Sequence, residues 1–373
     1  MDRRKTFLIL ATVGALLVSV PFLYRHFAGQ SDPAPPSTAE YFPVQDPDTG
    51  LWGFIDSGGN PVTPIVFDWA GDYRHGLGLA EQDGAMGYID ATFRDTGKWA
   101  IFPRFELTDP GDQSAFGFFE GRALARDTSG RWGYIGPEGK WAIEPRFAES
   151  PRDYPGVPAG NFSDGLAWFQ IVEMGERNKL DENDEFVLDA EGKPIKEAHP
   201  RRRVGFIDRN GEVVIDARYE MAHDFGEGLA AVRIKSHDAW AFINKDDRRV
   251  IPPSYDAVGR FSGGLCAVGV NLKVDNVGVE RWGYIDPAGN EVIGKRFDEA
   301  RDFSEGLAAV REGEKWGYIN IEGEWVIPPT FDNYEDYAHP NDPRPFENGL
   351  ARVSLDRQLI YIDRRGAQVW PKD

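Results

Sequence analysis

The sequence contains a single cysteine among its 373 residues, Cys266. One cysteine excludes a disulfide framework or a cysteine-based metal site within the chain. It stands in GGLCAV, where sister segments carry alanine, and this predicts a small buried side chain rather than a reactive thiol. The six histidines show no metal-ligand spacing, and no Gly-rich phosphate loop, G-x-S-x-G elbow or kinase signature is present. We therefore expect no catalytic residue, no cofactor and no metal.

Basic residues are also scarce, because 42 Lys and Arg face 61 Asp and Glu, giving a net charge of −19. A body this acidic repels phosphate backbones, so nucleic acid is excluded as an expected partner. The acidic run Asp181–Glu185 lacks the central glycine and the distal glutamate of a calcium loop. We interpret it as a solvated loop.

Long hydrophobic runs are absent except for Phe7–Leu23, which contains no charge and follows Arg3, Arg4 and Lys5. Basic residues before an apolar run place the amino end in the cytoplasm, and seventeen residues lie at the short limit for a spanning helix. We predict an uncleaved membrane anchor in residues 1–28, with a cleaved signal segment as the alternative. Residues 29–40 form a Pro-rich linker. The body, residues 41–373, is then outside the cytoplasm.

Aromatic residues make up 13% of the chain, and one aromatic phrase recurs eight times. The fourth position of each copy is aromatic and the fifth is Ile, and the shortest interval between copies is 34 residues. A period of this size is typical of a repeat architecture, in which neighbouring units complete each other's core. The eight copies are LWGFID (51–56), AMGYID (85–90), RWGYIG (131–136), RVGFID (203–208), AWAFIN (239–244), RWGYID (281–286), KWGYIN (315–320) and QLIYID (358–363).

Each unit is predicted to contain three antiparallel strands. Around Trp316, the segment LAAVRE gives the first strand, WGYIN alternates as a second strand, and EWVIPP gives the third, ended by Pro328 and Pro329. Turns such as DPAG favour a glycine with positive φ at the fourth position, where Asp247 stands in one copy. The third position of the phrase is glycine in six copies and Ala241 or Ile360 in the other two. This recurring glycine predicts close approach of a bulky group, which we expect to be an aromatic ring of an adjacent unit.

The repeated Trp, Gly and Tyr side chains admit two interpretations. We expect them to form the core, because regularly spaced exposed tryptophans would promote aggregation. The alternative is a stacking surface for a glycan. The positions selected as structural repeat residues are Trp52, Gly53, Trp132, Gly133, Trp240, Trp282, Gly283, Trp316, Gly317 and Tyr318.

The phrase WGYID..G..VI.P.FD.A..FSEGLA.V resembles the WG-repeat family of bacterial proteins, also called KWG repeats. The resemblance covers about residues 41–373 and is closest in KWGYINIEGEWVIPPTFD. Gly136 replaces Asp in the third copy, Val204 replaces Trp in the fourth, and the last copy is degenerate. The resemblance implies a β-rich repeat array in envelope or secreted proteins, and it carries no catalytic residues onto this chain.

The predicted fold is all-β: a tandem array of about eight three-stranded antiparallel meander units, open and twisted or superhelical. A closed propeller-like ring is the alternative. We rank it second, because a repeat of 34 residues is shorter than the usual 40–45 of a propeller blade. Three insertions interrupt the repeats, at 148–161, 172–203 and 333–345. The longest, 172–203, is either a functional loop or a flexible connection between units.

These inferences predict a non-catalytic, membrane-anchored envelope protein that acts as a binding scaffold for a protein or peptide. Its expected place is the bacterial inner membrane, with a single span and its body in the periplasm. The alternative is a glycan- or peptidoglycan-binding array. An envelope hydrolase is a distant third, since no single carboxylate pair departs from the repeat pattern.

Overall fold

The computed structural model describes residues 41–105, 117–148, 157–179, 186–235, 239–274, 277–333, 335–336, 339–340 and 343–371. No helix among these residues is long and apolar enough to cross a membrane. The predicted anchor in residues 1–28 and the linker in 29–40 lie outside the described residues.

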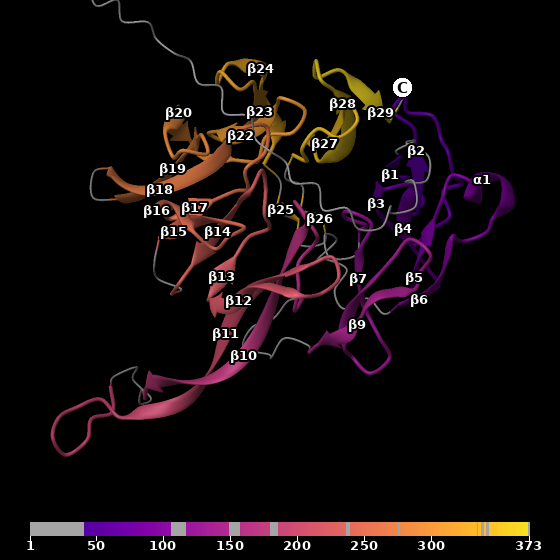
Figure 1. Ribbon diagram of the computed structural model, residues 1–373. Coiled ribbons are helices and arrows are strands. Elements are labelled where there is room, and N and C mark those ends of the chain that lie inside the picture. The colour runs from indigo at the N-terminus through magenta and orange to yellow at the C-terminus, as the bar shows by residue number, and fades with distance from the viewer. Residues whose placement is uncertain are drawn as a thin grey trace, which may run out of the picture. The chain divides into compact units, whose positions relative to one another are not determined.

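The described chain is built from small antiparallel sheets, with one short helix, α1 (Phe93–Thr96) (Figure 1). Among the described residues, seven sheets have three or four strands. In order along the chain they are β3 (Trp69–Arg74), β4 (Leu77–Gln82), β5 (Ala85–Ile89) and β6 (Ile101–Phe105); β7 (Ala123–Arg126), β8 (Trp132–Ile135) and β9 (Trp141–Phe147); β10 (Leu166–Asn178), β11 (Lys196–Asp208) and β12 (Val213–Tyr219); β13 (Met221–Ala222), β14 (Leu229–Arg233), β15 (Trp240–Asn244) and β16 (Arg249–Tyr255); β17 (Ala257–Val258), β18 (Cys266–Val274), β19 (Val277–Ile285) and β20 (Glu291–Phe297); β21 (Glu299–Ala300), β22 (Ala308–Glu312), β23 (Lys315–Ile319) and β24 (Trp325–Asp332); and β27 (Leu350–Leu355), β28 (Gln358–Asp363) and β29 (Gln368–Trp370).

Two smaller sheets complete the described structure. The first repeat copy lies in the pair β1 (Phe42–Gln45) and β2 (Trp52–Ile55), and the pair β25 (Glu335–Asp336) and β26 (His339–Pro340) lies in the 333–345 insertion.

The prediction of three strands per unit is correct for three of the larger sheets and incomplete for the other four. In three consecutive sheets a two-residue strand precedes the expected ones, as β21 pairs with β22 through Glu299↔Arg311 and Ala300↔Val310. The added strand comes from the segment after the FD dipeptide, which the sequence analysis treated as a connection. These three units therefore form the four-stranded sheet typical of a propeller blade.

The third strand of a unit continues past its prolines, contrary to prediction. Strand β24 runs from Trp325 to Asp332 and includes Pro328 and Pro329. Opposite Gly317, which separates Trp316 from Tyr318, β24 has three residues, so the strand bulges. A Cβ on Gly317 would lie 2.5 Å from the Ile327 carbonyl oxygen and 2.8 Å from backbone atoms of both prolines.

The expectation that an aromatic ring covers this glycine is therefore wrong. The group that approaches is the bulged backbone of the next strand in the same sheet, and the same arrangement places the Ile143 oxygen 2.5 Å from a Cβ on Gly133. Because backbone cannot rotate away as a side chain can, a Cβ at Gly317 or Gly133 would require the adjacent strand to move. One unit has a Cβ at this position, Ala241, opposite the same register shift between β15 and β16.

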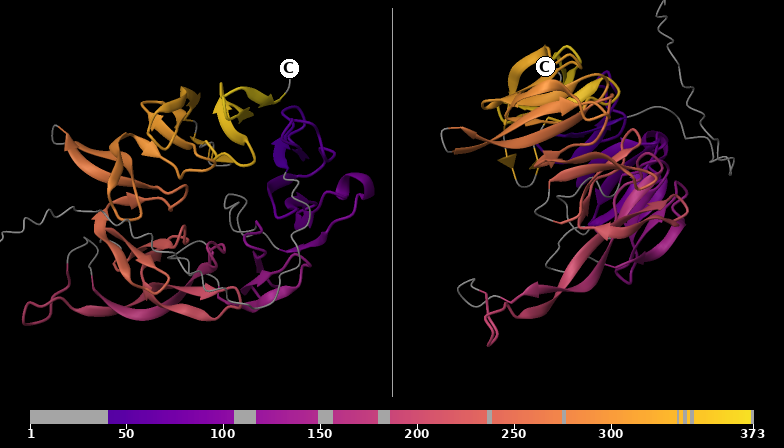
Figure 2. Two further views of the ribbon diagram at one scale, coloured as in Figure 1. Left: turned by 45° about the horizontal axis from the view of Figure 1, so that its top comes forward. Right: turned by 60° about the vertical axis from the view of Figure 1, so that its left-hand side comes forward.

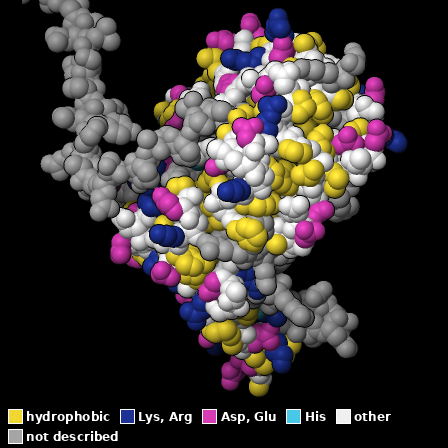
Figure 3. Space-filling view, turned by 90° about the vertical axis from the view of Figure 1, so that its right-hand side faces the viewer, with side chains coloured by type: hydrophobic (Ala, Val, Ile, Leu, Met, Phe, Trp, Pro, Cys, Tyr) yellow, Lys and Arg dark blue, Asp and Glu magenta, His cyan; other side chains and the backbone are white. Residues whose placement is uncertain are grey.

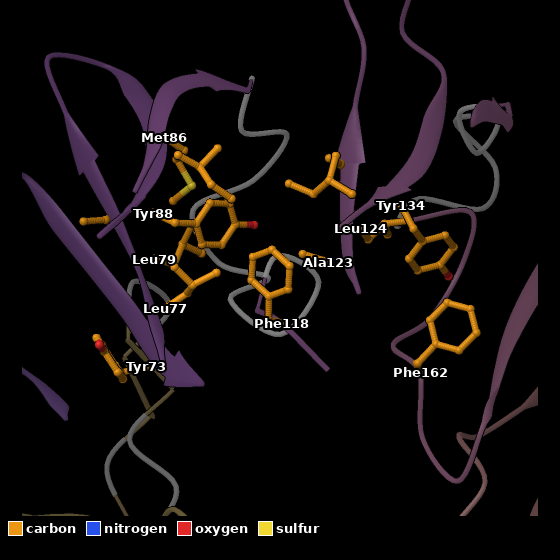
Figure 4. Packing of buried hydrophobic residues seen from close by; sticks show 14 of the residues in the cluster. Tyr73, Leu77, Leu79, Met86, Tyr88, Phe118, Ala123, Leu124, Tyr134 and Phe162 are labelled. Carbon is orange, nitrogen blue, oxygen red and sulfur yellow. The ribbon is translucent and has the colours of Figure 1, made fainter. Parts of the chain in front are cut away.

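The aromatic residue at the fourth position of each copy contacts an aromatic residue of the following unit. Tyr318 packs edge-on against Phe346 with ring centroids 4.8 Å apart, and Tyr284 against Phe303 at the same distance. Figure 4 shows two such pairs, Tyr88–Phe118 and Tyr134–Phe162. The core is consequently continuous from unit to unit, which is the energetic basis of a repeat array.

The same contact closes the array into a ring. Tyr361 of the last copy packs edge-on against Phe42 before the first, with centroids 5.5 Å apart, and its hydroxyl donates to the Pro43 carbonyl at 2.8 Å. Phe42, Val44, Ile55, Leu350 and Tyr361 form one buried cluster. The predicted open array is therefore wrong, and the closed ring given as the alternative is right in kind. Its blades are the seven larger sheets, not the eight predicted units (Figure 2). Closure leaves no end sheet exposed to unwanted pairing.

Candidate functional site

The repeated EGL segment forms a tight turn that links adjacent units. Glu305 and Gly306 both have positive φ, 51° and 78°, as in a type I′ hairpin turn. The Glu305 carboxylate accepts a hydrogen bond at 3.0 Å from the backbone N–H of Gly349, the equivalent glycine one unit later. The same bond recurs from Gly165 to Glu120, from Gly228 to Asp164 and from Gly264 to Glu227. These carboxylates therefore join units, which gives them a structural role.

Three charged residues lie just before or at the start of these turns, in consecutive units. Asp302 accepts a hydrogen bond from the backbone N–H of Arg260 at 2.8 Å, and Arg260 Nη1 donates to Ser163 Oγ at 3.2 Å. Burial raises the pKa of Asp302, and it raises the pKa of Asp224 to about 6, although Arg260 opposes both shifts. Arg260 therefore lies near two partly buried acids, and Arg301 also opposes the raised pKa of Asp302.

Asp224 is expected to make stability fall between about pH 4 and pH 6. Its folded-state pKa lies above the usual 3.8, so protonation favours the fold, and this contribution is lost as the pH rises through 6. Asp224→Asn should remove this pH dependence and raise the free energy of unfolding at pH 7.5 by on the order of 2 kcal/mol. Urea denaturation at pH 5 and pH 7.5 measures both effects.

The control for this change is Asp286→Asn at an exposed turn. Side-chain and backbone hydrogen bonds of Asn290 lower the pKa of Asp286, so its ionised form stabilises the fold. The Asp286→Asn variant should therefore still lose stability as the pH rises from about 4 to 6. An unchanged pH dependence in Asp224→Asn would show that Asp224 is not the titrating group.

A cavity of about 90 Å³ lies at the ring closure. Its walls come from the first unit at Tyr41–Pro43, the second at Asp72–Arg74 and the last at Arg344–Tyr361. Arg74 forms ion pairs with Glu347 and, at 3.4 Å, with Asp72, and so joins the second unit to the last. The charged side chains of the lining are those of Arg74, Arg344, Arg352, Asp72 and Glu347.

Opposing charges hold Asp72 ionised in this cavity. Burial alone would raise the pKa of its carboxyl, but Arg74, Arg344 and Arg352 together lower it below the usual value. For Arg352, burial is the main cause that lowers the guanidinium pKa, and Arg344 adds to it. The described lining of the cavity therefore holds three guanidinium groups beside two carboxylates.

The 172–203 insertion is largely an ordered hairpin that extends β10 and β11 beyond the propeller (Figure 2). We call residues 171–178 and 196–203 the β10–β11 arm. Paired residues of an antiparallel ladder share a face, so Val172, Met174, Ala198 and Pro200 lie on one face. The same face carries Arg202 and an ion pair of 3.5 Å between Lys196 and Glu176 at the outer end of the arm. The opposite face carries ion pairs of 2.7 Å between Arg177 and Glu197 and 2.8 Å between Arg203 and Glu173.

The repeat positions selected from the sequence lie in the propeller interior and form no pocket of their own. Trp52, Trp132, Trp240 and Trp316 are at most 4% exposed, while Trp282 is partly buried against its cluster. They offer no open face for stacking on a glycan. Cys266 is buried, as predicted. No cluster of His, Cys, Asp or Glu suited to a metal ion occurs within the described ranges.

The cavity and the arm were missed by the sequence analysis. Arg344 stands at the same position as Arg301 one unit earlier, and its proximity to Arg74 and Arg352 depends on closure of the ring. The arm had only a weak signal, because Val172, Glu173 and Met174 alternate over three residues and the alternation ends at Gly175.

Comparison with known proteins identifies the repeats. A model described as WG containing repeat matches residues 52–84, 132–171, 205–236, 240–272, 282–316 and 316–340. A search of curated proteins found no match. One similar solved structure is the extracellular domain of the putative hybrid two component system BT4673 from B. thetaiotaomicron, with 13% identity and a TM-score of 0.35. The similarity covers 88% of this chain and 44% of that one, so the chain spans less than half of the solved structure. The family matches cover more than half of the sequence, and the protein belongs to the WG-containing repeat family.

Proposed function

We propose that the protein is a non-catalytic scaffold, held at the outer face of the bacterial inner membrane by residues 1–28, that binds a protein partner through the β10–β11 arm. The observation that supports this function is the apolar face of the arm, where Met174 is 70% and Val172 is 39% exposed. The apolar run Phe7–Leu23 and the basic residues before it support the location.

The charges of the arm favour a partner with an acidic surface around an apolar strip. In a chain of net charge −19, the arm is basic. Its five basic residues are Arg177, Lys196, Arg201, Arg202 and Arg203, and its three acidic residues are Glu173, Glu176 and Glu197. By contrast, the face over the N-terminal sheets mixes apolar side chains with charges of both signs (Figure 3). An apolar strip with charged margins is typical of a protein interface.

Paired replacement of Val172 and Met174 by aspartate tests this proposal. Because both side chains are exposed, we expect the stability to change by less than about 0.5 kcal/mol per site. A partner is first captured from envelope extracts with residues 41–373, then purified, and its binding is titrated. We expect saturable binding of the partner to the unaltered protein. The double aspartate variant should bind at least tenfold more weakly, and rising salt should also lower the affinity.

The matched control is Val292→Asp, since Val292 is 49% exposed on β20, away from the arm. Equal loss of binding in this control would contradict an arm-specific interface. Sedimentation velocity of the purified chain distinguishes self-association from binding of a different protein. Titration with peptidoglycan fragments tests the glycan alternative. Binding of either kind without a protein partner would replace the proposed function.

A further inference from the structure

We propose that a pocket between two neighbouring sheets, β10–β12 and β13–β16, binds an aromatic ring that carries an acidic group. The pocket has a volume of about 410 Å³, and small-molecule sites usually measure roughly 300–1,000 Å³. Its walls come from the end of β12 at Tyr219 and from β14, β15, β16 and the turns beside them. Equivalent positions in two repeat units carry this inference, which does not depend on the arm.

One wall of the pocket is formed by Arg249, at a position where a sister unit carries tryptophan. Arg249 pairs with Ile243 across β15 and β16. Trp325 pairs with Ile319 across β23 and β24 in the same register. The two side chains therefore stand at equivalent points of their sheets, each beside the preceding sheet.

In the sister unit, the indole of Trp325 covers the junction between two sheets. Its ring packs edge-on against Phe297 of the preceding sheet, with centroids 5.9 Å apart. It also lies against the buried cluster that includes Val310 and Ile319. Replacement of this indole by the exposed side chain of Arg249 leaves room for a ring over a core that is already packed. The residues equivalent to Phe297, Val310 and Ile319 are Tyr219, Val232 and Ile243, and all three line the pocket.

The base of the pocket is apolar and includes an aromatic ring. Tyr219, Val232 and Ile243 are at most 5% exposed, so they belong to the packed core. Ile234 at the rim is 45% exposed. A planar ring on this base removes apolar surface from water, and it can meet Tyr219 edge-on as the sister tryptophan meets its phenylalanine.

The charges at the rim favour an acidic substituent on that ring. The described lining has one carboxylate, Asp247, which forms an ion pair with Arg218 and accepts a hydrogen bond from the Tyr219 hydroxyl. The second guanidinium of the lining is that of Arg249. Guanidinium groups stack on aromatic faces and bind carboxylates through two parallel hydrogen bonds. An aromatic acid can use both interactions, whereas an aromatic amine would meet two groups of its own charge.

Calorimetric titration of the purified protein with indole-3-acetate, indole and tryptamine tests the site. We expect indole-3-acetate to bind saturably and at least tenfold more tightly than tryptamine. The acid is either a free small molecule or a side chain of a peptide, and a capped tripeptide with tryptophan between two aspartates separates these sources. Tighter binding of the tripeptide than of indole-3-acetate identifies a peptide, and equal or weaker binding identifies a small molecule. Binding of neither would overturn the proposal.

Two replacements of Arg249 test the place and the charge of the site. Arg249→Trp refills the pocket as in the sister unit, so it should abolish binding of indole-3-acetate and raise the unfolding temperature. Arg249→Ala keeps the pocket open and removes the cation. It should weaken indole-3-acetate at least tenfold and change the affinity for indole less than twofold, a selective loss that decides the matter even if Arg249→Trp does not unfold cooperatively.

The matched control is Arg248→Trp, which places the same indole one residue earlier, at an exposed position outside the lining. It should keep the affinity for indole-3-acetate. Unchanged binding in Arg249→Trp, or an equal loss in Arg248→Trp, would show that the ligand does not occupy this pocket. Neither result bears on the scaffold function, because residues 171–178 and 196–203 of the arm do not line the pocket.

Discussion

Replacing Tyr361 by alanine is expected to lower the free energy of unfolding by about 3–5 kcal/mol, as for other fully buried aromatic residues. Tyr361 is 6% exposed, packs edge-on against Phe42 and donates its hydroxyl to the Pro43 carbonyl. The variant removes the buried ring and both interactions at the contact between the last repeat and the first strand. Urea denaturation followed by tryptophan fluorescence measures the loss.

Hydrogen exchange locates the effect of this replacement. Because Tyr361 closes the ring, we expect the backbone amides of β1 and β2 to lose protection before those of the central sheets. Tyr361→Phe is the conservative variant: it keeps the ring contact, leaves the Pro43 carbonyl without its donor and should cost about 1 kcal/mol.

Tyr318→Ala is the matched control, since Tyr318 makes the same edge-on contact with Phe346 inside the array. It should lower stability by a similar amount but expose amides around β23 and β27. If Tyr361→Ala left the amides of β1 protected, or cost less than about 1 kcal/mol, the ring would not depend on this contact.

The repeat pattern predicted the local structure because local structure depends on neighbours in sequence. The turn positions show this well: Gly289 and Gly323 have φ of 86° and 82°, and Asp247, expected to adopt the same conformation, has φ of 60°. The Asp286 carboxylate accepts backbone hydrogen bonds from Ala288 and Asn290, as a turn-initiating aspartate does.

Closure of the ring was not predictable from the same pattern. Repeat length argued against a propeller, since it suggested too few strands for a blade. The two-residue strands such as β21 are too short to show alternation, and they supply the missing fourth strand. The contact that closes the ring joins Phe42 to Tyr361, and no local pattern connects residues so distant in sequence.

The candidate site was unpredictable for a related reason. Arg352 aligns with a strand position at which other units carry apolar or small residues, and its neighbour Asp72 belongs to the second unit. In the sequence, Arg352 and Asp72 each resemble an ordinary charged residue on the protein surface. Only the closed ring places both in one cavity, so their proximity is a property of the tertiary structure.

Replacing Gly317 by alanine is expected to destabilise the protein by about 3 kcal/mol, the upper end of the usual cost of overpacking. The added Cβ would lie 2.5 Å from the Ile327 oxygen and 2.8 Å from backbone atoms of Pro328 and Pro329. These contacts are too short, and β24 must move to relieve them. Movement of β24 also disturbs Phe331, which packs against Tyr318 with centroids 6.2 Å apart.

The control for this replacement is Gly294→Ala on β20, where the nearest atom to an added Cβ is Glu291 Oε1 at 3.6 Å. That distance is an ordinary contact with a flexible side chain, and alanine costs less backbone entropy than glycine, so the control should be neutral or slightly stabilising. Denaturation of both variants under identical conditions gives the difference directly. Equal stability of the two variants would mean that β24 moves with little loss of stability. The glycine at the third position of the repeated phrase would then not be explained by the backbone of the adjacent strand.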